Sequence, residues 1–188
     1  MAEPATRSGT LTAEDLPYLR PDEERSELVA GSLVREPPPG TAHGWAAADV
    51  VALLHPFVRE HRLGRVSGEA GYVLASDPDT VRCPDASFVS TRRLAAGTWK
   101  GPYLVGAPDL AVEVISPGDR ASEVAAKAEE YLAAGAQAVW VLDPRRQTVT
   151  IHLPGREPQT LGRMDVLEGD PYLPGLRLRV AELLASQT

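Results

Sequence analysis

The sequence predicts a single domain of the α/β class. The prediction rests on three consecutive segments, namely a short apolar run over Leu110–Ile115, a helix-like segment after it, and a second apolar run over Ala138–Leu142. This order of strand, helix and strand is typical of a sheet with a helix packed on one face. A chain of 188 residues is long enough to bury one such core without disulfides or structural metal.

Composition narrows the function classes. The single cysteine, Cys83, excludes an internal disulfide and a cysteine cluster for zinc. No apolar run approaches the roughly 20 residues of a membrane span, and the N-terminus is polar, so we expect a cytoplasmic protein without a membrane partner. The 19 lysines and arginines against 26 acidic residues give a net charge of −7, which disfavours non-specific nucleic-acid binding. A local basic groove over an acidic metal site stays open.

The N-terminal part contains small elements. Residues 1–10 are small and polar without a period, so we expect a disordered tail before a domain of residues 11–188. Thr12 with Asp15 three residues later resembles a capping box and predicts a short helix. The alternation over Glu27–Val34 predicts a β-hairpin.

A long helix and two strands come next. Apolar residues at helical spacing predict the helix over Thr41–His61, and Pro56 within it predicts a kink or an early end. Alternation predicts two further strands, Arg65–Leu74 and Val81–Val89, and the second of them carries Asp85.

The segment Ser90–Gly106 lacks a sustained period, so we expect a long surface loop with one helical turn at most. It carries Arg92, Arg93, Trp99 and Lys100. These side chains could contact a phosphate backbone, with Trp99 stacked on a base, although charged loop residues are more often simply solvated.

The C-terminal half begins with the strand–helix–strand unit. Ser116 before a proline predicts the N-cap of the helix, and Gly135 predicts its end. The strand Ala138–Leu142 should pair with Thr148–Leu153 as a hairpin. A closing strand and a short helix over Val180–Leu184 complete the domain.

Glu113 lies in the middle of an apolar strand, where an ionised carboxylate costs several kcal/mol unless it is paired or bound to metal. Asp109 shares its face but lies about 13 Å away, at roughly 3.3 Å per residue. Asp85 belongs to another strand, and neighbouring strands lie only about 4.8 Å apart. We therefore rank Asp85 and Glu113 above Asp109 as a pair.

Lys127 lies at the edge of the apolar face of the predicted helix, from where its amine can reach toward Glu113. The alternative is a lysine whose stem covers the core while its ammonium stays in water, and position alone favours this alternative. Taken singly, Asp85 in a Pro-Asp pair also has an ordinary explanation as a turn residue.

Taken together, these residues resemble those of the Uma family of restriction-endonuclease-like proteins, a domain family without an assigned function. The similarity covers nearly everything from Glu27 to Leu184. Its motifs in this chain are Glu27–Gly31, His43 at the start of the long helix, Pro84-Asp85, Pro108–Pro117, Lys127 with Tyr131 and Gly135, and Trp140–Pro144.

That family is similar to a branch of the PD-(D/E)XK nuclease superfamily, which implies a restriction-endonuclease-like core of a mixed sheet flanked by helices. The resemblance implies Asp85 and Glu113 as ligands of Mg²⁺ or Mn²⁺. The usual lysine would lie two residues after Glu113, where this chain has Ile115, so the resemblance assigns that amine to Lys127. It also places Glu27 among the catalytic residues and His43 near them.

The expected chemistry is metal-dependent hydrolysis of phosphodiester bonds in DNA, since oxygen ligands favour magnesium or manganese over zinc. Two alternatives remain, a catalytically inactive module that binds nucleic acid or protein, and a hydrolase of a small phosphate ester. Ile115 and the acidic balance keep the inactive module open as an alternative. The oligomer that we expect, if one forms, is a homodimer.

Overall fold

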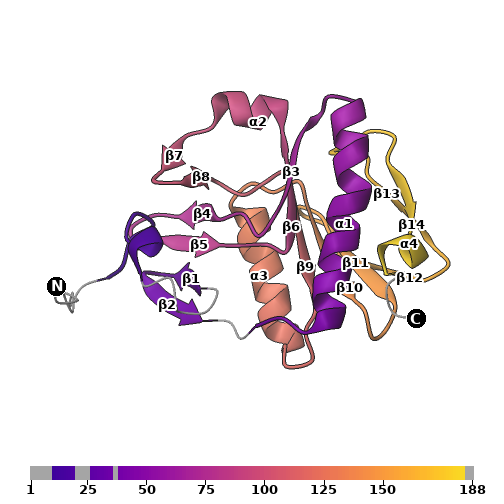
Figure 1. The fold of residues 1–188 in the computed structure, drawn as a ribbon, viewed down its shortest axis with the longest axis horizontal. Coiled ribbons are helices and arrows are strands. Elements are labelled where there is room, and N and C mark those ends of the chain that lie inside the picture. Colours follow the sequence, from indigo (N-terminus) through magenta and orange to yellow (C-terminus); the bar gives the residue numbers. More distant parts are fainter. Residues whose placement is uncertain (1–9, 20–25, 36–37, 185–188) are drawn as a thin grey trace.

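Two six-stranded sheets and a two-stranded ribbon build the fold (Figure 1). The computed structural model describes residues 10–19, 26–35 and 38–184, so nearly all of the tail predicted over residues 1–10 lies outside the described residues. The predicted α/β class is confirmed. Both six-stranded sheets are mixed, because each contains a parallel and several antiparallel pairs.

The central sheet carries the strand that contains Glu113. In this sheet β9 (Leu110–Val114) is parallel to β10 (Ala138–Asp143) and antiparallel to β6 (Ala86–Ser90), so it has a hydrogen-bonded neighbour on each side. In spatial order the strands are β12 (Gln159–Gly162), β11 (Thr148–His152), β10 (Ala138–Asp143), β9 (Leu110–Val114), β6 (Ala86–Ser90) and β3 (Gly64–Gly68).

Helices cover both faces of the central sheet. Alternate residues of β9 point to opposite faces, so Leu110, Val112 and Val114 join the core beneath α1. Ala111 packs instead with Tyr131 of α3. Glu113 shares the face of Ala111 and therefore points toward α3. The helices are η1 (Leu16–Tyr18, a 3₁₀ turn), α1 (Thr41–Glu60), α2 (Thr91–Ala96), α3 (Ala121–Ala133) and α4 (Val180–Leu183).

A smaller sheet lies beside the central one, on the left of Figure 1. It confirms the predicted hairpin, whose turn residues Ala30 and Gly31 both have positive φ. Its strands, in spatial order, are β2 (Ser32–Arg35), β1 (Ser26–Val29), β5 (Thr80–Arg82), β4 (Tyr72–Ala75), β8 (Tyr103–Val105) and β7 (Trp99–Lys100). The separate ribbon consists of β13 (Val166–Glu168) and β14 (Arg177–Arg179).

Two strand predictions were wrong in the same way. The segment Arg65–Leu74 is not one strand but β3 and β4 in different sheets, and Glu69 between them has φ of +48°. The segment Val81–Val89 likewise divides into β5 and β6. Pro84 cannot donate a ladder hydrogen bond, which favours a break there. The chain therefore crosses between sheets just before β6, and Asp85 lies at that crossing rather than within a strand.

Three local predictions also need correction. The expected loop over Ser90–Gly106 contains α2, β7 and β8. The helix α1 continues past Pro56 to Glu60, so the early end was wrong. The helix α3 begins at Ala121 with Arg120 as its N-cap, so Ser116 lies outside the helix, where its hydroxyl hydrogen-bonds His43 and its N–H donates to Asp119. No helix among the residues described above is both long and apolar enough to cross a membrane.

Candidate active site

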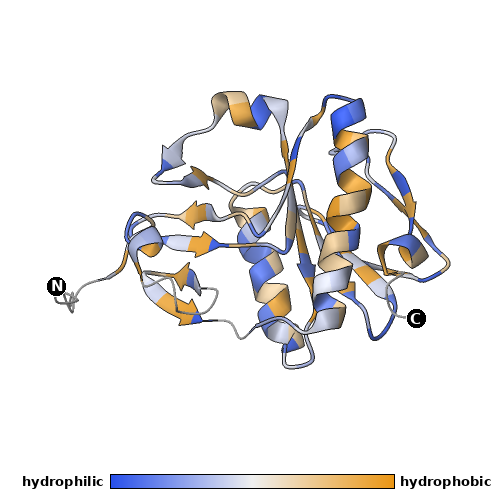
Figure 2. Cartoon of the chain, in the orientation of Figure 1, coloured by the Kyte–Doolittle hydropathy of each residue, from blue (hydrophilic) through white to orange (hydrophobic). Residues whose placement is uncertain are grey.

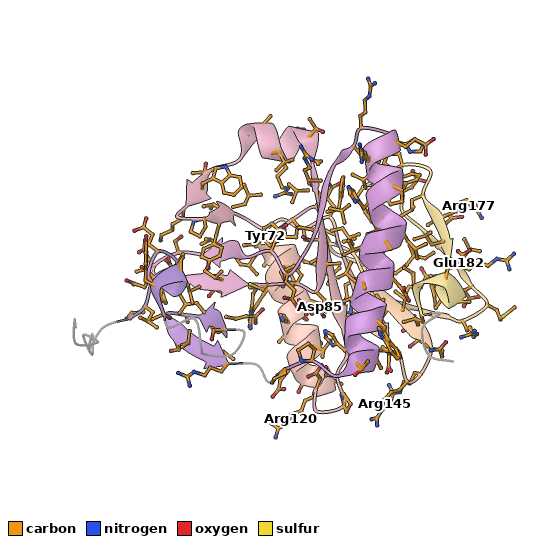
Figure 3. All side chains as sticks on the ribbon, viewed as in Figure 1. Tyr72, Asp85, Arg120, Arg145, Arg177 and Glu182 are labelled. Carbon is orange, nitrogen blue, oxygen red and sulfur yellow. The ribbon has the colours of Figure 1, made fainter. Side chains whose placement is uncertain are left out.

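A cavity of about 650 Å³ lies where the two sheets meet. Its walls come from the hairpin β1–β2, the start of α1, the end of β9 with the loop that follows, and the first half of α3. Asp85, Glu113 and Lys127 all line it. Figure 3 labels Asp85 in the middle of the molecule, between α1 and α3, whereas Arg120 and Arg145 extend outward at the lower edge.

Glu113 is buried, with 11% of its side chain exposed, and both of its oxygens have partners. The Tyr131 hydroxyl donates to Oε1 at 2.8 Å, and Lys127 Nζ lies 3.1 Å from Oε2. Tyr131 and Lys127 are four residues apart on α3, so they present one face of that helix to the strand. The partner that the buried carboxylate requires is therefore a lysine held by the same helix as the tyrosine.

Lys127 forms a second ion pair, with the carboxylate of Glu27. Glu27 on β1 is fully buried, and its Oε1 lies 3.1 Å from Lys127 Nζ. Glu27 also accepts hydrogen bonds from Cys83 N–H and from Arg82 Nη1, both at 2.8 Å. The structure thus places Glu27 beneath the lysine, where it can position the amine, and not at the surface of the cavity.

Each of the two carboxylate oxygens of Asp85 has its own partner. Its Oδ2 accepts a hydrogen bond of 2.7 Å from Val114 N–H, which fixes the carboxylate beside Glu113. Its Oδ1 lies 3.1 Å from His43 Nε2, and the Nδ1 of that histidine is 3.0 Å from Ser116 Oγ. The chain therefore orients Asp85 from β9 on one side and from α1 on the other.

These contacts shift the protonation of the site. Burial is the largest of the effects that raise the pKa of Glu113 to about 7, against the opposing charge of Lys127, and the carboxylates of Asp85 and Glu27 act in the same direction as burial. Burial also raises the pKa of Tyr131. In Glu27, burial is outweighed by Lys127, the Cys83 N–H and Arg82, so its pKa lies below the usual value. The ionised form of the buried Glu113 therefore needs a nearby cation.

The donor set can be compared with what a metal requires. Among the described residues, no group of three or more His, Cys, Asp or Glu side chains could hold a metal ion. Asp85 and Glu113 offer carboxylate oxygens at a cavity with room for water. Mg²⁺ commonly binds through one or two carboxylates and keeps several waters, whereas zinc usually takes three or four nitrogen or sulfur ligands. The two carboxylates fit magnesium or manganese and do not fit a zinc cage.

Asp109 does not join the site, in line with its lower rank. It is fully buried and accepts hydrogen bonds of 2.6 Å from Ser90 N–H and from Gln137 Nε2. Arg93 Nε lies 3.3 Å from the same carboxylate, and Lys100 pairs with Asp79. The α2–β7 segment, which carries Arg93 and Lys100, lies at the top of Figure 1, whereas the loop from β9 to α3, which lines the cavity, lies at the bottom.

Arg82 is the site residue that sequence reasoning missed. Besides its bond to Glu27, it makes hydrogen bonds of 2.7 and 3.0 Å to Glu130 on α3. The available signal was an arginine inside the predicted strand Val81–Val89, three residues before Asp85, since an arginine buried in a strand needs carboxylate partners. Its partners, Glu27 and Glu130, are far away in sequence and could not be read from spacing.

Residues 12–181 match the Uma2 family, which is described as "Putative restriction endonuclease". The fold is similar to the crystal structure of a protein from Anabaena variabilis ATCC 29413 described as "a putative nuclease belonging to DUF820". The two have a TM-score of 0.78 and 22% sequence identity, and the match covers 93% of this chain and 98% of that chain. At that identity the likeness concerns the fold alone. No curated protein matches the chain.

Proposed function

The chain belongs to the Uma2 family, and from that premise we propose that it is a metal-dependent endonuclease that hydrolyses phosphodiester bonds of DNA. The observation that carries the proposal is the meeting of Asp85, Glu113 and Lys127 around one cavity, although Ile115 occupies the usual position of the lysine. Three side chains from a crossing, a strand and a helix would not gather there for packing alone, since each is charged and costly to bury.

In this proposal, Asp85 and Glu113 would hold Mg²⁺ or Mn²⁺. When bound, such an ion polarises the phosphate and lowers the pKa of a water. The chain's own residues do the positioning. Val114 N–H and His43 orient Asp85, while the Tyr131 hydroxyl orients Glu113. Lys127 offsets negative charge at the phosphate in the transition state or orients the attacking water, and Glu27 keeps its amine in place.

The test is cleavage of plasmid and single-stranded DNA, with Mg²⁺, Mn²⁺ or EDTA, by wild type beside Glu113→Gln. We expect metal-dependent cleavage by wild type, reduced by about a hundredfold or more in Glu113→Gln. If neither substrate is cut, hydrolysis of bis(4-nitrophenyl) phosphate separates the two alternatives. Hydrolysis of this ester alone favours a small phosphate ester as substrate, and no hydrolysis favours an inactive binding module.

A further inference from the structure

We propose that the cavity takes a single unpaired nucleotide, so that the preferred substrate is single-stranded or locally unpaired DNA and not an intact duplex. The inference rests on the proposed function and names the substrate class of the same site. It comes from three features of the described residues, which are the depth of the carboxylates, the apolar wall beside them, and the pairing of the nearby cations.

The carboxylates lie too deep for a paired backbone. Asp85 and Glu113 expose only 3% and 11% of their side chains, so a phosphate must enter the cavity to approach them. A cavity of about 650 Å³ falls in the range of about 300–1,000 Å³ that holds one small molecule. A phosphate between two paired nucleotides is held in the stacked duplex, whereas an unpaired nucleotide can turn inward.

Part of the cavity wall is apolar. It is formed by Val29 and Val34 of the hairpin, by Pro38 and Pro39 before α1, and by Val124, one turn before Lys127 on α3. Val34 is 39% exposed although it is hydrophobic, and it faces this cavity. In Figure 2 the hairpin β1–β2, at the lower left, contains hydrophobic segments. An apolar wall beside a phosphate site suits the face of a nucleobase, which every unpaired base presents.

The cations near the cavity are already paired, which disfavours a long duplex track. Lys127 contacts two carboxylates, and Arg82 contacts Glu27 and Glu130. With a net charge of −7, the chain has little basic surplus with which to hold the backbone of a duplex. Contact with the base must then contribute much of the affinity.

The test measures binding, so that it does not depend on activity. A labelled single-stranded oligonucleotide, the same oligonucleotide with abasic sites, and its paired duplex are titrated by fluorescence anisotropy with Ca²⁺ present. We expect the single strand to bind at least about fivefold more tightly than either the abasic strand or the duplex. Equal affinity of the single strand and the abasic strand, or tighter binding of the duplex, would overturn the inference even if wild type cleaves DNA.

Val34→Asn, with Val105→Asn as its control, locates the base. Both valines are 39% exposed on strands of the smaller sheet, but only Val34 lines the cavity. We expect Val34→Asn to weaken the base-bearing strand about threefold or more and to leave the abasic strand unchanged, while Val105→Asn changes neither. The same loss in both variants refutes the base contact. Absent cleavage with these binding differences intact refutes the nuclease activity and leaves only the binding of an unpaired nucleotide in the cavity.

Discussion

Two roles were open for Lys127, a catalytic amine and a lysine that only covers the core, and its contacts distinguish between them. Its amine lies 3.1 Å from both Glu113 and Glu27, so the residue is not a lysine with a free ammonium in water. Only 14% of its side chain is exposed, and it lines the cavity beside the two proposed metal ligands. This geometry favours the migrated amine over the snorkelling alternative that position alone favours.

The first prediction concerns Lys127→Met. Methionine keeps the packing of the stem, so we expect the fold and most of the metal affinity to remain while the cleavage rate falls by about a hundredfold or more, the scale for one positioned electrostatic group. The measurement is single-turnover cleavage in Mg²⁺. Adding Ile115→Lys to Lys127→Met returns an amine to the usual position, and partial recovery would show that both positions serve one site. Unchanged activity in Lys127→Met would contradict the role.

The second prediction concerns Asp85 and Glu113. Two neighbouring carboxylates repel until a cation binds, so we expect millimolar Mg²⁺ or Mn²⁺ to raise the melting temperature of wild type but not of the Asp85→Ala, Glu113→Ala double variant. Differential scanning fluorimetry with EDTA as reference measures it. Equal shifts in the two proteins would remove the metal site.

At the scale of elements, Asp109 connects three pieces of secondary structure. It precedes β9, accepts from Ser90 at the start of α2, and accepts from Gln137 before β10. Arg93 of α2 adds an ion pair and donates to the carbonyl of Gly135 after α3. A buried carboxylate thus supports the scaffold at the other end of the strand that carries Glu113.

The third prediction follows from the pKa of Asp109. Burial acts to raise that pKa, but hydrogen bonds from Ser90 and Gln137, together with the charge of Arg93, hold it below the usual value. The ionised form therefore stabilises the fold at pH above about 4, and this stability is lost as the pH falls through the folded pKa. We expect Asp109→Asn to lower the free energy of unfolding at pH 7 by about 1–3 kcal/mol and to approach wild type below about pH 4.

Urea unfolding at pH 7, 5 and 3.5 measures this difference. Asp165→Asn is the control, because Asp165 is exposed and its side chain accepts a hydrogen bond from Gly162 N–H. A difference between wild type and Asp109→Asn that stays constant with pH would show that the charge of Asp109 does not contribute.

For the whole molecule, Arg82 holds the smaller sheet against the central layer. It starts from β5, contacts Glu27 on β1, and forms two hydrogen bonds with Glu130 on α3. Since Glu27 also holds Lys127, the same contacts that join the sheets complete the site.

The fourth prediction concerns this junction. Arg82→Met leaves the buried Glu27 with one cation fewer, so we expect a loss of about 3–5 kcal/mol in the free energy of unfolding, still in a single transition. Arg146→Met is the matched control, because Arg146 is 83% exposed and its pair with Asp143 should contribute little. Equal stability of the two variants, or separate unfolding of two parts, would contradict the prediction.

Size-exclusion chromatography of the same samples tests the expected homodimer.

Features that follow local rules could be predicted from the amino-acid sequence. Burial on both faces makes Leu110–Val114 an apolar run, helical periodicity places Lys127 beside Tyr131, and Gly135 ends α3 with φ of +97°. Because these patterns depend on neighbours within a few residues, they could be read directly, and so could the isolated charge of Glu113.

The remaining features depend on contacts between distant parts of the chain. Two predicted strands divide between separate sheets, and although Pro84 favours a break in the ladder, the packing of the sheets determines which sheet each half joins. Glu27 reaches Lys127 across 100 positions of sequence, and His43 reaches Asp85 across 42. Alternation indicates which face of a strand a side chain takes, but it contains no information on which distant element covers that face. The pairing of buried charges therefore had to be seen in the folded chain.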